Sequence, residues 1–232
     1  MTEPAPRIAV VVFPGSNDDR DAALALETLG AEPVLHWHAE PELPAVGAVV
    51  LPGGFSYGDY LRAGAIARFS PAMQAVAEYA TNGGYVLGIC NGFQVLCEAG
   101  LLPGVLRPNE SLSFVCRDVA VRVERNDAPF LAACETGQRL TIPVKHGEGC
   151  YFADAELLAE LERNRQIVLR YEGESPNGSI DDIAGVVNAD GNVMGLMPHP
   201  EHAVDPLLGS SDGALILQAL VERARERLLA AA

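Results

Sequence analysis

The feature that most constrains the fold of this chain is an apolar segment that runs directly into a Gly-x-Cys-x-Gly turn and then into a helical pattern, over residues 85–94. Gly88 and Gly92 permit the crowded backbone of such a strand-to-helix corner, where a Cβ would clash. The following helix directs its free N–H groups and the positive end of its dipole at Cys90, which favours the thiolate. The segment therefore predicts a nucleophilic cysteine at the tip of a tight turn.

Apolar runs alternate with helical patterns throughout the first half of the chain. Strands are predicted at 7–13, 33–37, 47–51 and 85–89, and helices at about 18–29, 59–67 and 71–82. We expect Asp18 or Asp19 to cap the first helix. This alternation predicts a parallel sheet with helices on both faces and an active site at the carboxyl ends of the strands. Both Gly53-Gly54 and Cys90 follow strands, so we expect them to share one crevice.

The second half of the chain carries signals of antiparallel strands. Residues 114–124 alternate apolar and polar side chains, and 189–192 is a hairpin turn signal. Further short strands are predicted at 141–144, 166–171, 183–188 and 193–197, and an amphipathic helix at about 211–229. No long linker or internal repeat interrupts these patterns. We therefore expect one α/β domain over residues 1–232, a flavodoxin-like parallel sheet with an added antiparallel portion.

Composition argues against several classes of function. The formal net charge is −15 and no basic cluster with interleaved aromatic residues is present, so nucleic acids and anionic membranes are poor partners. The longest apolar run, near residues 45–51, is too short to cross a bilayer. Five cysteines without a CxxC pair disfavour a zinc knuckle and fit a reducing compartment. We expect a cytoplasmic protein without a metal site.

A cysteine nucleophile needs a base, and the base needs an orienting group. His199 follows a predicted strand and lies between two prolines, which we expect to hold the segment extended. Residues two apart in an extended segment point the same way, so Glu201 can orient His199 toward Cys90. Backbone N–H groups of Asn91, directly after the nucleophile, and of Gly54 are candidate donors to an oxyanion. The pattern predicts acyl transfer by a Cys-His-Glu triad.

These motifs together resemble the class I (triad) glutamine amidotransferases, in the same order and over nearly the whole chain. The longer segments 13–17, 53–65 and 146–149 are similar to glutaminase subunits of phosphoribosylformylglycinamidine synthase. The resemblance implies that the cysteine attacks the side-chain amide of glutamine, releases ammonia and leaves a thioester for hydrolysis. It also implies that the backbone of residues 109–114 holds the α-amino and α-carboxyl groups. The substrate-binding residues implied in this way are Gln94, Asn109, Ser111 and Phe114.

The resemblance further implies partners. Ammonia passes to a large synthetase subunit, where ATP and magnesium serve the conversion of formylglycinamide ribonucleotide to the amidine in de novo purine biosynthesis. A small bridging subunit completes the complex, and no cofactor is implied for this chain itself. With 232 residues and no Walker-type loop, the chain has no room for the synthetase domain.

Two alternatives use the same features. One is a stand-alone hydrolase of γ-glutamyl amides with the same fold, and the other is a binding subunit that has lost its activity. The resembled family often has cysteine where this chain has Asp18, and we expect this departure to lie outside the chemistry. The spacing of His199 and His202 invites a metal site, but Pro200 between them argues against a helix that would align both rings.

Several other residues receive a weaker assignment. His146 either lines the rim that faces the synthetase or the ammonia exit, or belongs to a loop held by its glycines. Asp59 and Arg62 are predicted to form an ion pair on a helix beside the Gly-rich loop. The remaining cysteines are expected to be structural: Cys97, Cys116, Cys134 and Cys150.

Overall fold

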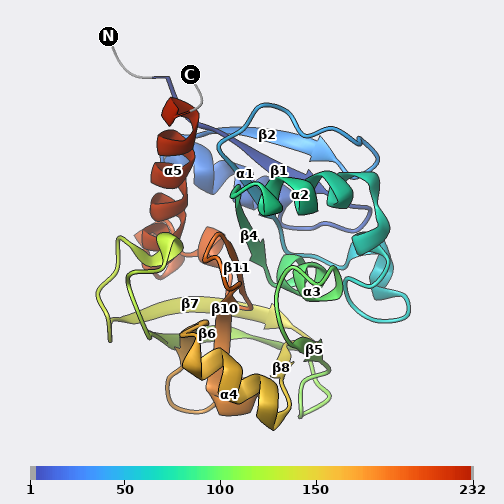
Figure 1. Cartoon of the computed structure of the whole chain (residues 1–232). Coiled ribbons are helices and arrows are strands. Elements are labelled where there is room, and N and C mark those ends of the chain that lie inside the picture. Colours follow the sequence, from blue (N-terminus) through green and yellow to red (C-terminus); the bar gives the residue numbers. More distant parts are fainter. Residues whose placement is uncertain (1–3, 231–232) are drawn as a thin grey trace.

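A nine-stranded sheet organises the computed structural model, which describes residues 4–230 (Figure 1). Its strand order is β2-β1-β3-β4-β11-β10-β9-β6-β7. The five strands of the parallel half are β1 (Arg7–Val12), β2 (Glu32–Trp37), β3 (Ala48–Leu51), β4 (Tyr85–Ile89) and β11 (Val193–Leu196). All but the edge strand β2 are almost wholly buried, as the continuous apolar runs predict for strands covered on both faces.

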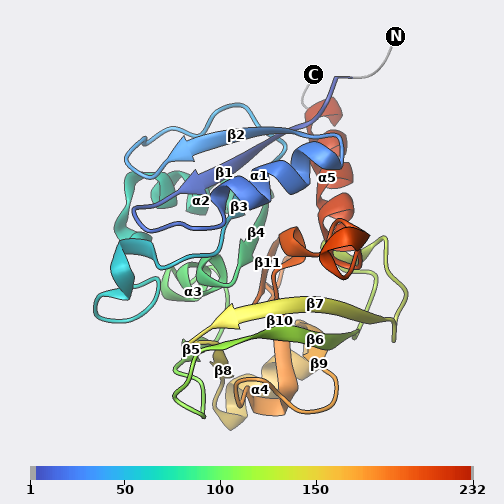
Figure 2. The same cartoon turned by 180° about the vertical axis from the view of Figure 1, so that it is seen from behind.

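Antiparallel strands extend this sheet beyond β11. They are β10 (Ile183–Val187), β9 (Ile167–Tyr171), β6 (Val115–Val123) and β7 (Arg139–His146). The hairpin predicted at 189–192 joins β10 to β11, so it is also the point where strand direction reverses. Figure 2 shows β7 along the edge of this portion. The sequence patterns missed a separate two-stranded sheet, β5 (Val105–Arg107) with β8 (Cys150–Phe152).

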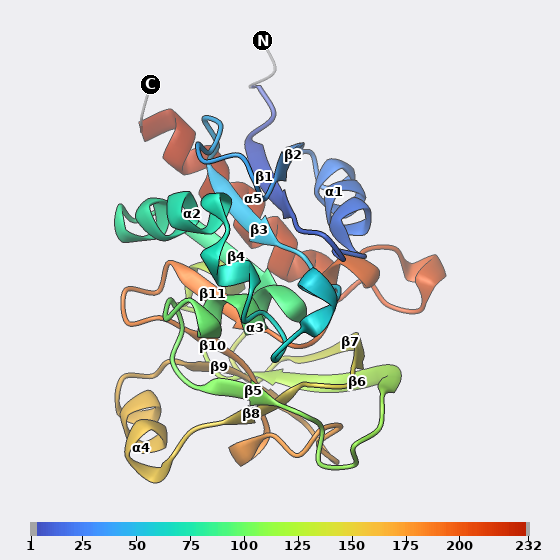
Figure 3. The same ribbon diagram turned by 90° about the vertical axis from the view of Figure 1, so that its right-hand side faces the viewer.

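Helices cover both faces of the parallel half, as predicted. In Figure 3, α1 and α5 lie on one side of β1 and β3, while α2 and α3 lie on the other. Their bounds are α1 (Asp19–Thr28), α2 (Pro71–Thr81), α3 (Asn91–Glu98) and α5 (Gly213–Ala230), and α4 (Ala155–Arg163), which was not predicted, lies beside the antiparallel portion. Ser70 caps α2 by accepting a hydrogen bond from Met73 N. Asp18 stands at the corresponding position of α1 but makes no side-chain capping bond, so that prediction is wrong.

The helix predicted at residues 59–67 is also wrong. Short 3₁₀ turns stand at both ends of this region, at 56–59 and 67–69, and irregular backbone lies between them. Tyr57, Asp59 and Leu61 have φ values of 55°, 54° and 71°, which an α-helix excludes. Arg62 pairs with Glu98 of α3, at 2.7 Å between Nη2 and Oε2, and not with Asp59.

The topology brings three predicted segments to one edge of the sheet. The loops that follow β3, β4 and β11 carry Gly54, Cys90 and His199, and these strands are neighbours in the sheet. A single continuous cluster of buried apolar side chains supports them from both halves of the sheet. Among residues 4–230, no helix is long and apolar enough to pass through a membrane.

Candidate active site

Cys90 occupies a strained position between β4 and α3. Its φ of 50° and ψ of −102° lie outside the common regions for an L-residue. A Cβ on Gly92 would stand 2.0 Å from Leu51 O, and one on Gly88 would stand 2.7 Å from Gly92 C, so both positions require glycine. The predicted strand-to-helix corner is therefore confirmed. It holds the Cys90 side chain at the first turn of α3, and Sγ donates to Lys145 O at 3.8 Å.

His199 and Glu201 form the buried pair that the His-Pro-Glu segment predicts. Nδ1 of His199 lies 2.6 Å from Oε1 of Glu201, and the two residues are 0% and 3% exposed. The segment is not extended, however, because Pro200–His202 form a 3₁₀ turn. The tight turn, and not the alternation of an extended strand, brings the carboxylate onto the ring.

Charge on the neighbouring groups decides the protonation of His199. Burial alone lowers the pKa of His199, but Glu201 and Cys90 outweigh burial and raise the pKa to about 10. The ring is therefore an imidazolium at neutral pH. Its Nε2 is buried and has no hydrogen-bond partner among the described residues. This leaves a proton on the nitrogen that is not bound to Glu201, ready for transfer to a reacting group.

A cavity of about 200 Å³ opens over Cys90. Of the predicted site residues, Gly54, Cys90, Gln94 and Phe114 line it, together with Asn17, Asp18, Phe55, Asp59, Lys145, His146, Gly147 and Glu148. His199 and Glu201 lie behind this lining, in the protein interior. The cavity thus presents the thiol to solvent and keeps the base and its orienting carboxylate dry, which strengthens their mutual attraction.

The predicted oxyanion donors come from two neighbouring loops. Asn91 is the first residue of α3, so its N–H has no partner in a preceding helical turn. Its side chain accepts a hydrogen bond from Ser56 N at 3.1 Å and donates one to Gln94 Oε1 at 2.8 Å. These bonds tie the irregular loop after β3 to the helix after β4. The loop that carries Gly54 is therefore held beside the nucleophile.

Asn109 and Ser111 lie outside the cavity lining. Asn109 is fully buried, and its Oδ1 accepts hydrogen bonds at 3.0 Å from both His146 Nδ1 and Gly149 N. This side chain therefore joins the loop at 109–114 to the one at 146–149. Ser111 borders a separate surface hollow with Arg117 and Glu174.

The cavity wall opposite the histidine is acidic. Burial, followed by the charge of Glu148, raises the pKa of Asp59 to about 6. Asp59 has one weak neutral contact, Asn91 Nδ2 at 3.4 Å from Oδ1. His146 beside them is 3% exposed, and its pKa is lowered to about 4 by burial and then by the charge of His199. His146 is therefore neutral, and it donates through Nδ1 to Asn109, which leaves Nε2 as an acceptor.

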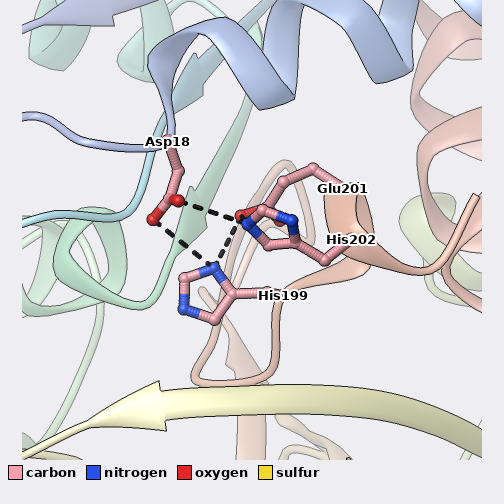
Figure 4. Close-up of side chains that lie close together, drawn as sticks. All are labelled: Asp18, His199, Glu201 and His202. Carbon is pink, nitrogen blue, oxygen red and sulfur yellow. Dashed lines mark hydrogen bonds and ion pairs between the residues drawn. The ribbon is translucent and has the colours of Figure 1, made fainter. Parts of the chain in front are cut away.

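Asp18 lies inside the site, so the expectation that it stands apart from the chemistry is wrong. Its Oδ2 is 3.7 Å from Nδ1 of His199, and its Oδ1 is 3.2 Å from His202 Nε2 (Figure 4). Oδ1 also binds the ammonium of Lys145. The sequence patterns also passed over Lys145, Glu148 and Phe55. Lys145 is the next-to-last residue of β7 and Glu148 follows that strand by two residues, so their place at a strand end was an available signal.

The same cluster has the donor types of a metal site. One ligand atom from each of Asp18, His199, Glu201 and His202 lies within 4.8 Å of the others. The ammonium of Lys145 already provides a cation here, since Nζ is 2.8 Å from His202 Nε2 and also donates to Asp18. With this ammonium and the His199 imidazolium in place, the cluster is neutralised by protein groups, which disfavours a second bound cation.

None of the cysteines is paired in a disulfide. Cys134 and Cys150 are buried, which fits the structural role expected of them, but Cys116 is exposed on β6. Exposure makes Cys116 an accessible thiol and a control for Cys90.

Comparison with known proteins identifies close relatives. A family model described as a CobB/CobQ-like glutamine amidotransferase domain matches residues 5–212. Phosphoribosylformylglycinamidine synthase subunit PurQ of Rubrobacter xylanophilus is 61% identical over 219 residues, which are 94% of this chain and 99% of that protein. The subunit of the same name from Salinibacter ruber is 56% identical over 93% of this chain and 95% of that protein.

Solved structures agree with these relatives. A chain in the structure of PurLQS from Thermotoga maritima is 46% identical, with a TM-score of 0.86 over 94% of this chain and 98% of that chain. A glutamine amidotransferase from Thermotoga maritima, 18% identical, has a TM-score of 0.60 over 98% of this chain and 99% of that chain, and shows a shared fold alone. The α/β fold with an added antiparallel portion is confirmed.

Proposed function

Because the chain belongs to the CobB/CobQ-like glutamine amidotransferases and, among them, with the PurQ subunits, we propose that it is the glutaminase subunit of a phosphoribosylformylglycinamidine synthase. It hydrolyses glutamine to glutamate and ammonia and supplies the ammonia to a synthetase subunit. The product of that partner is formylglycinamidine ribonucleotide, in de novo purine biosynthesis. The observation that carries the chemistry is the buried His199, held by Glu201 at 2.6 Å behind the strained Cys90 elbow.

We propose that Cys90 and His199 carry the chemical steps, with Glu201 holding the His199 ring in place. Cys90 Sγ forms a bond to the side-chain amide carbon of glutamine, and the carbonyl oxygen becomes an oxyanion near the N–H groups of Gly54 and Asn91. His199 Nε2 gives its proton to the leaving nitrogen, the C–N bond breaks, and ammonia departs. Water then attacks the thioester while His199 accepts one of its protons. The C–S bond breaks, glutamate leaves, the second proton passes to solvent, and the thiolate of Cys90 is restored.

The cavity walls fit the two ends of glutamine. Gln94 and the Phe55–Phe114 pair, whose rings lie 6.5 Å apart, border the cavity beside Cys90. Asp59 and Glu148 provide negative charge that suits the α-ammonium group. We propose Gln94 and Phe114 as direct contacts, and Asn109 and Ser111 as residues that shape the loop bordering the α-carboxyl end.

The proposed partners are a synthetase and a small bridging subunit. This proposal is supported by the similarity to a chain of PurLQS. ATP and magnesium would act on the synthetase, and we propose no cofactor for this chain. We further propose that residues 1–232 act as one domain and that the protein works in the cytoplasm, where its five unpaired cysteines would remain reduced.

Glutamate release from glutamine tests the proposed function. The purified chain is assayed alone and with the synthetase, the bridging subunit, ATP, magnesium and formylglycinamide ribonucleotide. We expect low activity alone and a large rise in the complex. Cys90→Ala should abolish release while the fold is retained, and Cys116→Ala, which changes the exposed thiol of β6, should match the wild type.

Other outcomes would favour the two alternatives. High activity of the isolated chain, with no response to partners or acceptor, would identify a stand-alone γ-glutamyl amide hydrolase. Tight binding to the synthetase without glutamine hydrolysis in any mixture would identify a non-catalytic subunit. Full activity of Cys90→Ala would overturn the triad itself.

A further inference from the structure

We propose that Asp18 is a positioning residue for the glutaminase reaction, acting with Lys145 as a clamp that holds His199 in line between Glu201 and Cys90. This inference rests on the proposed function for its kinetic consequences. Its structural basis does not depend on the reaction, because it concerns only how separate segments of the chain pack around the His199 ring.

Asp18 contacts the machinery through both its backbone and its side chain. Its N–H donates to Gly53 O at 3.2 Å, which fixes the residue just before the proposed oxyanion donor Gly54. Its carboxylate is 5% exposed and stands 3.7 Å from Nδ1 of His199. A Cβ on Gly53 would lie 2.4 Å from Asp18 Oδ2 and 2.6 Å from His199 Cε1. Asp18 is thus packed between the oxyanion loop and the base.

Lys145 completes the clamp from the antiparallel half of the sheet. Its backbone carbonyl accepts from Cys90 Sγ at 3.8 Å, while its ammonium binds Asp18 Oδ1 and lies 2.8 Å from His202 Nε2. Lys145 therefore contacts Cys90 through its backbone, and through its side chain it contacts Asp18 and His202, the residues beside His199. The ion pair ties β7 to the first turn of α1 and to the turn that carries His199.

Charge gives the clamp a second effect. The groups that face the His199 ring are the carboxylates of Glu201 and Asp18, the thiol of Cys90, the rings of His202 and His146, and, beyond Asp18, the ammonium of Lys145. Burial raises the pKa of Asp18, but His202, His199 and Lys145 outweigh burial and hold it well below its usual range. Asp18 therefore stays ionised and favours the imidazolium beside it.

Removal of this carboxylate has a defined consequence. In Asp18→Asn the imidazolium loses one of its anionic neighbours, and Lys145 is left without a counter-ion on the same side. Both changes make His199 lose its proton at lower pH. Lys145→Met in addition to Asp18→Asn removes the unbalanced ammonium and should restore part of the loss.

The test compares pH profiles of glutaminase kcat/KM in the reconstituted complex. For Asp18→Asn we expect the basic limb to move down by about one pH unit, with kcat about tenfold lower and KM within about twofold of wild type. The double variant should recover part of both the shift and the rate. Asp19→Asn, the same substitution one residue further along α1, is the matched control and should keep the wild-type profile.

A second readout does not depend on glutamine. The rate of Cys90 alkylation by iodoacetamide is followed against pH in a Cys116→Ala background, with and without Asp18→Asn. If the proposed function fails, wild-type glutamate release is absent but the alkylation profiles still separate. If Asp18→Asn does not fold, the pH profiles of kcat/KM and of alkylation are measured for Asp18→Glu and Lys145→Met and compared with the wild type. An unchanged basic limb and alkylation profile, or a loss confined to thermal stability, would overturn the clamp.

Discussion

Two of the carboxylates that line the cavity over Cys90, Asp18 and Asp59, differ in whether a cation balances them. Asp18 is bound by Lys145 and stands beside the His199 imidazolium, and its pKa lies well below the usual range despite burial. Asp59 has a second carboxylate, Glu148, as its charged neighbour, and burial with that charge raises its pKa to about 6. The pKa values of two aspartates in the same cavity are thus shifted in opposite directions.

Whether a buried carboxylate has a cationic partner within the fold indicates whether it positions a catalytic group or binds a ligand. A buried charge whose partner is part of the fold is held in one place, and it can position a catalytic group. A charge that lacks a partner costs free energy until a ligand of opposite sign arrives, and this cost is repaid on binding. We therefore associate the Asp18 side with alignment of the triad and the Asp59 side with the α-ammonium group of glutamine.

The largest expected effect comes from crowding the balanced side. Gly53→Ala places a methyl group against Asp18 Oδ2 and His199 Cε1, and these groups must move. A displacement near 1 Å in such a site costs about 100-fold in rate, so we expect at least about this loss in kcat/KM. Gly137→Ala, in an open turn, is the control. Activity within about threefold of wild type would contradict close packing as the source of alignment.

The second effect concerns stability. Lys145→Met leaves the carboxylate of Asp18 buried without its counter-ion, and Lys145 itself is 31% exposed. We expect the free energy of unfolding to fall by about 2 kcal/mol, less than for a fully buried pair. Urea denaturation at pH 7 measures the change. The control is Arg139→Met. Arg139 is on β7 like Lys145, and it forms an exposed ion pair with Glu172, so its loss should cost less than about 0.5 kcal/mol. Equal losses of stability in the two variants would contradict a difference between the buried and the exposed pair.

The unbalanced side should show a gain in stability together with a loss in binding. Asp59→Asn removes the cost of an isolated carboxylate and the proposed partner of the α-ammonium. We expect KM for glutamine to rise about tenfold with kcat nearly unchanged. Glutamate release at pH 8 measures this. Asp190→Asn, at the distant hairpin turn, is the control, and an unchanged KM in Asp59→Asn would place the ammonium elsewhere.

The stability change in Asp59→Asn depends on pH. A folded-state pKa of about 6, above the usual carboxyl value of 3.8, means that the wild type loses stability as pH rises from about 4 to about 6. The variant lacks this loss, so it should be more stable by about 1 kcal/mol at pH 8, after allowance for solvent screening, and equal to wild type at pH 4. Thermal denaturation at the two pH values measures both. A constant difference would contradict the raised pKa.

The smallest effect is the pH dependence of binding. Because the pKa of Asp59 is about 6, its carboxylate is largely protonated at pH 5.5 and ionised at pH 7.5. KM for glutamine should therefore be about fourfold higher at pH 5.5. The dependence should vanish in Asp59→Asn and persist in Asp18→Asn. Its persistence in Asp59→Asn would assign the titration to another group.

Local patterns predicted those parts of the site whose geometry depends on neighbouring residues. The elbow at Cys90 follows from Gly88 and Gly92, because the steric demand of a strand-to-helix corner lies within a few residues. The pairing of Glu201 with His199 was also predicted, although through an extended segment and not the 3₁₀ turn that the structure has. The contact was predicted despite this error, because residues two apart lie near each other in both an extended segment and a 3₁₀ turn.

Contacts across the sheet could not be predicted in this way. The residues at 59–67 have a helical pattern in sequence, but they follow an irregular path. A salt bridge from Arg62 to Glu98 and, just before them, a hydrogen bond from Ser56 N to Asn91 Oδ1 hold this path. Tertiary bonds of this kind outweigh local helix propensity, which is worth less than about 1 kcal/mol per residue. The same holds for Asn109, whose four side-chain hydrogen bonds reach residues up to 40 positions away.

The sequence by itself determined the α/β class and pointed to the proposed nucleophile, base and orienting carboxylate, because each depends on periodicity or on spacing within a short segment. Only the tertiary structure decided that Asp18 stands beside His199 and that Lys145, 127 positions away, balances it. It also decided that Glu148 is the charged neighbour of Asp59, which has no cationic partner among residues 4–230. Electrostatic interactions depend on distance in space and on burial, and neither can be read from separation along the chain.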